Sequence, residues 1–145
     1  MELDTFYQIS LLYPEVNFNG SYMSVSYHRN GDSEKSQWTI NVEEEFDCFK
    51  NALVNNWHIE KRGWSLHPSN RLMEIGKLKS GKSSFIIRFQ EMSPIGQEVQ
   101  NRWHGYPADI KAKNNDIPPD AVLRDWLDKK YIKNHQFSKI RRASL

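Results

Sequence analysis

Apolar and polar residues alternate with a period of two in several segments, as is typical of half-buried β-strands. Residues 21–28 and residues 38–42 both show this alternation, and the Asn-Gly-Asp turn signal at residues 30–32 lies between them. We therefore predict a β-hairpin from these two segments. Residues 3–13 fit either a strand or a helix, because their apolar residues also repeat at helical spacing.

A second β region is predicted farther along the chain. Residues 57–66 are rich in β-formers and are interrupted by a glycine, and residues 71–78 and 83–90 flank a Lys-Ser-Gly-Lys turn, which predicts a second hairpin. Residues 76–83 match the spacing of a phosphate-binding loop. That loop must be followed by a helix, whereas strand-like residues follow here. We therefore interpret the match as a basic β-turn.

Three segments have a helical pattern. A helix is predicted over residues 42–55, because Asn41 and Glu44 have capping-box spacing and the aromatic residues after them recur on one face. Residues 119–130 carry an apolar face behind a proline pair, and Asn134 is placed to cap a second short helix. These last two helices form a predicted C-terminal helical pair.

The chain has 145 residues, of which 38% are hydrophobic and 12% aromatic, so we expect a small core rich in aromatic side chains. No repeat or linker divides it. The predicted fold class is α+β: residues 1–145 form a single domain with a mainly antiparallel sheet of about five strands, one packed helix and the C-terminal helical pair.

Charge is divided unequally along the chain. Residues 1–60 contain ten acidic and three basic side chains, and residues 61–145 contain seventeen basic and eight acidic ones. An acidic surface attracts and orients a basic protein partner. We therefore predict a non-enzymatic protein-interaction module, and the candidate partner-binding residues are Asp32, Glu34, Glu43, Glu44, Glu45 and Asp47. The alternative role of the glutamates is to stabilise the dipole of their own helix.

In general character, a small α+β chain with an acidic patch resembles the small bacterial immunity proteins and antitoxins that inhibit a basic toxin nuclease. The resemblance implies an inhibitor that neutralises its partner by covering it. It includes no family-specific motif, so no residue role is transferred to this chain.

Two other functions are open. The first is nucleic-acid binding through the basic C-terminal helices, because phosphate binding needs several positive charges on one surface. The candidates are Lys129, Lys130, Lys133, Lys139, Arg141 and Arg142, joined by Lys111 and Lys113.

The second is a small metal-independent ribonuclease centred on His104. Residues 101–107 read as a compact loop in which His104 lies close to Arg102 and Tyr106. The histidine would act as a general base while the arginine holds the phosphate. In the competing interpretation the aromatic residues only anchor the loop.

Several classes of protein are disfavoured. Cys48 is the single cysteine, so an internal disulfide is excluded and a reducing compartment is expected. No apolar run reaches the ~18 residues of a membrane span, and the N-terminal residues are acidic, unlike a signal peptide. We expect a cytoplasmic protein with no membrane association, no bound metal and no cofactor.

Overall fold

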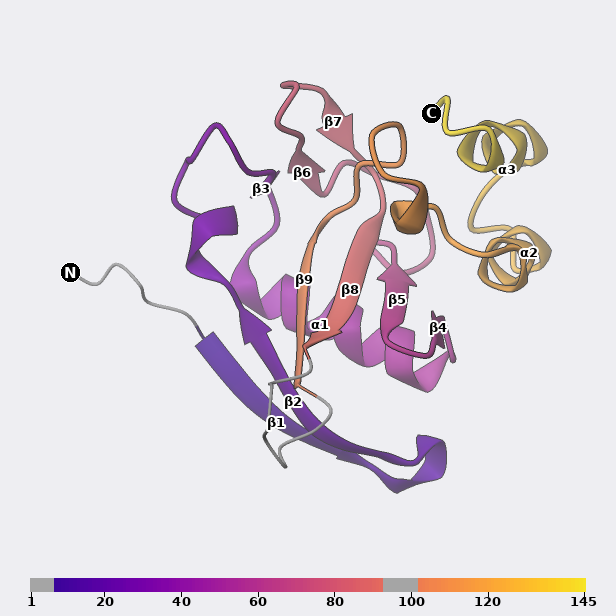
Figure 1. Cartoon of the computed structure of the whole chain (residues 1–145). Helices are drawn as coiled ribbons and strands as arrows, with labels where there is room; N and C mark the ends of the chain where they lie inside the picture. Colours follow the sequence, from indigo (N-terminus) through magenta and orange to yellow (C-terminus); the bar gives the residue numbers. More distant parts are fainter. Residues whose placement is uncertain (1–6, 93–101) are drawn as a thin grey trace.

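The computed structural model describes residues 7–92 and 102–145. Within these residues the largest sheet contains six strands. Figure 1 shows this sheet with a helix across one face and a smaller sheet at one end. In spatial order its strands are β1 (Tyr7–Tyr13), β2 (Phe18–Ser24), β9 (Arg102–Pro107), β8 (Ile87–Met92), β5 (Arg62–Ser65) and β4 (His58–Ile59).

The smaller sheet is antiparallel, in the order β3 (Gln37–Trp38), β6 (Gly76–Lys77) and β7 (Ser83–Ser84). The α-helices are α1 (Val42–Val54), α2 (Asp120–Asp128) and α3 (Asn134–Arg141). Short 3-10 turns are η1 (Pro14–Val16), η2 (Ser26–His28) and η3 (Asn114–Asp116). The predicted α+β class is confirmed.

The large sheet is mixed. β2 and β9 are parallel, while the other four pairings in this sheet are antiparallel, so the prediction of a mainly antiparallel sheet holds. The hairpin predicted from residues 21–28 and 38–42 is wrong. Both edges of β2 are already occupied by β1 and β9, the chain leaves the sheet through η2, and β3 pairs with β6 instead. Residues 7–13 are a strand; the first part of the ambiguous segment lies outside the described residues.

Helix α1 matches its prediction closely. Asn41 Oδ1 accepts a hydrogen bond from the Glu44 backbone N–H at 2.8 Å, and the Glu44 carboxylate accepts one from the Asn41 N–H at 2.9 Å. This reciprocal pair satisfies N–H groups that the helix itself leaves free. Phe49 packs from the helix onto Tyr22 and Phe89 of the sheet, with ring centroids 4.7 and 5.1 Å away. The core therefore forms between α1 and the large sheet.

The second predicted hairpin forms in a shorter version. β6 and β7 pair around a turn in which Gly81 has a positive φ of 89°, a conformation that favours glycine. The chain then enters β8, which belongs to the large sheet. The segment that matches a phosphate loop is thus strand, turn and strand, as interpreted from the sequence. Residues 57–66 form the β4–β5 hairpin.

Residues 102–107 are strand β9, so the prediction of a compact loop is wrong over the described part of that segment. Tight packing explains why this strand contains a glycine, Gly105. A Cβ at this position would collide with the Tyr22 hydroxyl and lie 2.8 Å from Phe89 Cδ1, so only glycine lets these rings pack onto the strand backbone. The glycine therefore marks a close packing contact.

Both C-terminal helices form as predicted. Trp126 of α2 is fully buried edge-on against Trp57, and the Trp57 indole N–H donates to Asp125 at 2.8 Å. These contacts join α2 to the segment that follows α1. Asn134 is the first residue of α3 rather than its cap. The Gln136 side chain accepts a hydrogen bond from the Lys133 N–H instead, at 2.8 Å.

Candidate functional site

A pocket of about 480 Å³ opens where η2, the loop after it, the β6–β7 turn and the end of β9 meet. Besides two acidic residues, Glu34 and Asp109, its wall combines aromatic rings with basic side chains. The residues that carry these properties are His28, His104, Tyr27, Tyr106, Lys35, Lys79 and Lys113.

The strand and the 3-10 turn position the rings. Alternation along β9 buries Trp103 and Pro107 and leaves His104 and Tyr106 on the opposite side, half-buried. His28 ends η2, and its Nδ1 lies 2.8 Å from the Ser36 carbonyl oxygen. The His28 and Tyr106 rings are stacked with centroids 5.8 Å apart. The two histidines thus reach one pocket from segments far apart in the sequence.

Two of the lysines are held by aromatic rings. Lys35 Nζ lies 5.1 Å from the centre of the Tyr27 ring, and Lys113 Nζ lies 5.2 Å from the centre of the Tyr106 ring. Such cation–π contacts fix an ammonium group without neutralising it. Lys79 is different, because its Nζ is 3.1 Å from the Glu34 carboxylate. Lys35 and Lys113 therefore bring positive charge to the pocket that remains available to an anion.

Both histidines favour the neutral state. Burial lowers the pKa of His28 to about 4, and His104, Lys35 and Lys113 add to this effect, while the Ser36 carbonyl opposes it. Burial, followed by the positive charge of Arg88, also lowers the pKa of His104. Near neutral pH the rings are uncharged. A bound anion would raise both pKa values, so the site could gain protons as an anion enters.

The buried His28 ring makes stability depend on pH. Its pKa falls from 6.5 in the unfolded chain to about 4 in the folded one, so the unfolded chain binds a proton more readily. The stability associated with the neutral ring is therefore complete above pH 6.5 and is lost as the pH falls toward 4. That contribution is about 3 kcal/mol at 1.36 kcal/mol per pH unit. We expect His28→Gln to flatten the fall in unfolding free energy between pH 7 and 4, measured by urea titration.

The exposed His135→Gln variant is the matched control and should keep the wild-type pH profile. The comparison between variants is needed because burial raises the pKa of Glu45, which adds stability as the pH falls and so acts in the opposite direction. Equal slopes for His28→Gln and the wild type would contradict the assignment.

A buried ion pair supports the pocket wall. The Tyr106 hydroxyl donates to Asp116 Oδ1 at 2.8 Å, and the Asp109 N–H donates to Asp116 Oδ2 at 2.8 Å. Arg88 Nε lies 3.6 Å from Asp116 Oδ1 and donates to the Asn115 carbonyl at 2.9 Å. Burial, reinforced by Asp116, raises the pKa of Tyr106 above its usual value. Tyr106 is therefore a protonated residue of the pocket wall, and its hydroxyl is held by the hydrogen bond to Asp116.

The predicted His104 centre is thus assembled differently than expected. His104 and Tyr106 do line one pocket, but Arg102 does not line it. The positive charge comes from Lys35 and Lys113, because Lys79 is paired with Glu34. Sequence reasoning missed His28. In the strand predicted for residues 21–28 this histidine would fall on the polar face, whereas the chain has already left the sheet there and His28 is buried.

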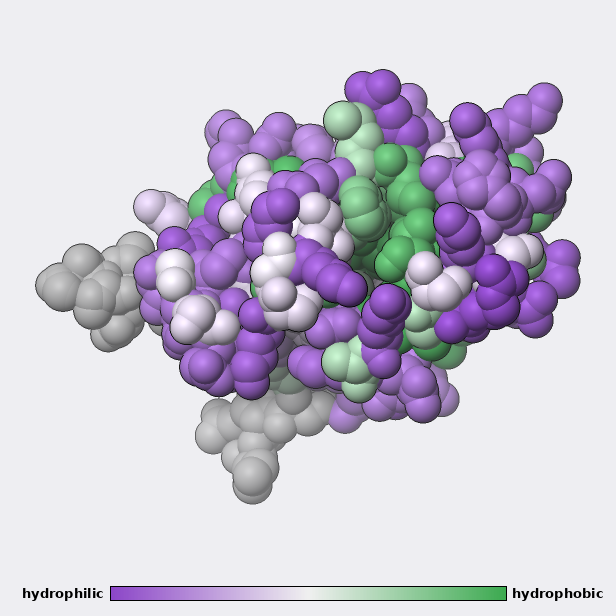
Figure 2. Space-filling model, turned by 90° about the horizontal axis from the view of Figure 1, so that it is seen from above, coloured by the Kyte–Doolittle hydropathy of each residue, from purple (hydrophilic) through white to green (hydrophobic). Residues whose placement is uncertain are grey.

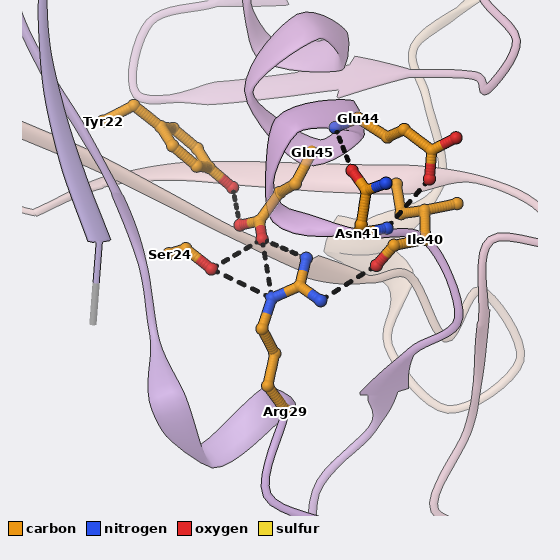
Figure 3. Close-up of polar contacts among 7 residues, drawn as sticks. All are labelled: Tyr22, Ser24, Arg29, Ile40, Asn41, Glu44 and Glu45. Carbon is orange, nitrogen blue, oxygen red and sulfur yellow. Dashed lines mark hydrogen bonds and ion pairs between the residues drawn. The ribbon is translucent and has the colours of Figure 1, made fainter. Parts of the chain in front are cut away.

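One predicted partner-binding acid lies in the core. Glu45 is fully buried, and its carboxylate accepts hydrogen bonds from the Tyr22 and Ser24 hydroxyls at 2.5 and 2.7 Å and pairs with Arg29 at 2.7 Å (Figure 3). The assignment of Glu45 to a contact surface is wrong. The helical period could have indicated this, because Glu45 lies one turn before the buried Phe49 on the same face.

The remaining acids are at the surface. Glu44 is half-buried, occupied by its capping box and 3.2 Å from His67 Nε2. Glu34 pairs with Lys79. Those classed as exposed are Asp32, Glu34, Glu43 and Asp47. Binding of a basic partner by this reduced set stays a prediction.

Six of the basic candidates are exposed on or beside α2 and α3, away from the pocket lining, whereas Lys113 lines the pocket and Lys111 lies in the loop after β9. Two of them are paired within the chain: Lys129 lies 2.9 Å from Asp125, and Arg141 lies 3.2 Å from Asp120. The others are Lys130, Lys133, Lys139 and Arg142. Their role in nucleic-acid binding stays a prediction.

Within residues 7–92 and 102–145, no group of three His, Cys, Asp or Glu side chains lies close enough together to hold a metal ion. No helix in these ranges is long and apolar enough to cross a membrane. Cys48 is buried on α1, and burial raises the pKa of its thiol.

Comparisons with protein families, curated proteins and solved structures find no match for this chain.

Proposed function

We propose that this protein binds single-stranded nucleic acid, with one phosphate group seated in the pocket between His28 and His104. The observation that carries the proposal is the convergence of two neutral histidines with Lys35 and Lys113 on one aromatic-walled pocket. Cationic grooves combined with aromatic side chains are the common means of holding a single strand. A phosphate would be attracted by Lys35 and Lys113 and would stabilise protonated histidine.

The geometry supports binding better than strand cleavage. Metal-independent cleavage of RNA needs a base and an acid placed on either side of one phosphate. The neutral histidines suit the role of base, but the Tyr106 hydroxyl already donates to Asp116, and Arg102 lies outside the pocket lining. Binding requires only the positive charge and the rings that are in place.

The test is the affinity of the full chain for a fluorescently labelled single-stranded RNA oligomer at pH 7, measured by anisotropy at two salt concentrations. The variant is Lys35→Gln/Lys113→Gln. We expect it to bind about tenfold more weakly and to have a salt slope lower by about 1, because the two lysines together neutralise one phosphate.

The matched control is Lys130→Gln/Lys133→Gln, which removes the same charge from the C-terminal helices. Its affinity should stay close to that of the wild type. If this control loses affinity while the pocket variant does not, the binding surface is the basic helical pair. Measuring the length of the oligomer after incubation reports cleavage in the same samples.

We retain the inhibitor function as a second proposal, supported by the exposure of Glu43 and Asp47 one turn apart on α1. Electrostatic capture of a basic protein toxin would use these carboxylates. Reversing both charges should weaken only a protein complex and leave RNA affinity unchanged or higher. The same variant thus separates the two proposals.

A further inference from the structure

A second hollow, of about 310 Å³, adjoins the pocket and has a different character. One side is formed by β7 and the residues that lead from it into β8. The other side is the loop that follows β9. Its wall is mostly apolar, as the patch of hydrophobic residues on the face in Figure 2 illustrates. The apolar lining residues are Leu78, Phe85, Ile86, Ala108, Ile110 and Leu145.

This apolar groove and the pocket share part of their walls. Leu78, Asp109 and Ala112 line both hollows. A ligand whose phosphate is seated between His28 and His104 would therefore have its neighbouring group beside the groove. Together the two hollows have the size of a site for a small organic molecule rather than for an isolated inorganic ion.

Positive charge is present on both sides of the apolar wall. Lys82 and Lys111 line the groove itself, while Lys35 and Lys113 line the adjoining pocket. The occupant that matches this pattern has a flat apolar group between two anionic groups. A nucleotide within a single strand has this form, since its base is flanked by a phosphate on each side. A fatty acid has an anionic group at one end only.

Resting on the proposed function, we infer that the apolar groove receives one unpaired base of the bound strand and that Phe85 supplies the ring on which it stacks. Phe85 is half-buried and lines the groove, so part of its ring remains accessible. Stacking on an aromatic ring accepts any base, because every base has a π-face. The groove thereby favours single strands over duplexes without selecting a sequence.

The experiment compares two labelled oligomers of equal length and charge: an RNA oligomer with all its bases, and its abasic counterpart. We expect the wild-type chain to bind the base-bearing oligomer about tenfold more tightly. In Phe85→Ala this ratio should fall close to one while affinity for the abasic oligomer is unchanged. Phe85→Tyr keeps the ring and should retain the wild-type ratio.

Each outcome decides the inference. Equal affinity of the wild type for both oligomers overturns base binding in the groove but leaves phosphate binding in the pocket standing. Weak binding of both oligomers overturns both. If Phe85→Ala does not fold by circular dichroism, Phe85→Leu, which removes the ring but keeps an apolar side chain, provides the same readout. A ratio that this folded variant leaves unchanged also overturns the inference.

Discussion

Replacing Arg29 with alanine is expected to lower the free energy of unfolding by about 3–5 kcal/mol, because the Glu45 carboxylate would remain buried without its counter-charge. The Arg29 guanidinium is 2.7 Å from this carboxylate and also donates to the Ile40 carbonyl at 2.9 Å. Glu45 is fully buried, and burial already raises its pKa. The loss should therefore be partly relieved at low pH, where the isolated carboxyl group takes up a proton.

Urea denaturation at pH 7 and pH 5 measures this effect. The double variant Arg29→Ala/Glu45→Gln should recover much of the lost stability, since it removes the buried charge while keeping a hydrogen-bonding side chain. Arg71→Ala changes an exposed arginine and should cost less than 0.5 kcal/mol. A loss below about 1 kcal/mol for Arg29→Ala would show that the charge of Glu45 is compensated in another way.

Replacing Asp116 with alanine is expected to cost a similar amount, about 3–5 kcal/mol, because Arg88 would be left as a buried cation without its partner. Asp116 and Arg88 are both nearly fully buried. Asp116 also accepts hydrogen bonds from the Tyr106 hydroxyl and the Asp109 N–H, both at 2.8 Å. These two donors would lose their acceptor in the same substitution.

The same variant connects stability with the pocket. Tyr106 is held in the pocket wall by Asp116, so Asp116→Ala should also weaken RNA binding in samples that are still folded. Tyr106→Phe is the matched comparison, because it removes one hydrogen bond and should cost about 1 kcal/mol. Unfolding curves for both variants give the comparison, and equal losses would contradict a main role for the ion pair.

Helices were the elements best predicted from the sequence. Their signals are local: the Asn41–Glu44 capping pair and the aromatic period of α1 lie within a few turns of chain. The β6–β7 turn was also predictable, because Gly81 adopts a conformation that few other residues tolerate. Strand partners were harder, since the same alternation allows pairing with any strand of matching pattern.

The candidate site likewise combines residues that a local pattern could indicate with residues that only the fold brings together. His104 and Tyr106 could be selected from the sequence because they lie two residues apart. Their neighbours in the pocket come from η2, the loop after it, the β6–β7 turn and the loop after β9. No local pattern relates His28 to His104, so the site could be only half predicted.

The sequence by itself determined the helices, the tight turn and the α+β class, because capping, period and turn chemistry act between residues close together in the chain. The tertiary structure decided that β2 pairs with β9 in parallel, that Glu45 lies in the core and that the pocket forms. These outcomes depend on which distant surfaces bury one another most completely. That competition is settled by packing, which a local sequence pattern does not contain.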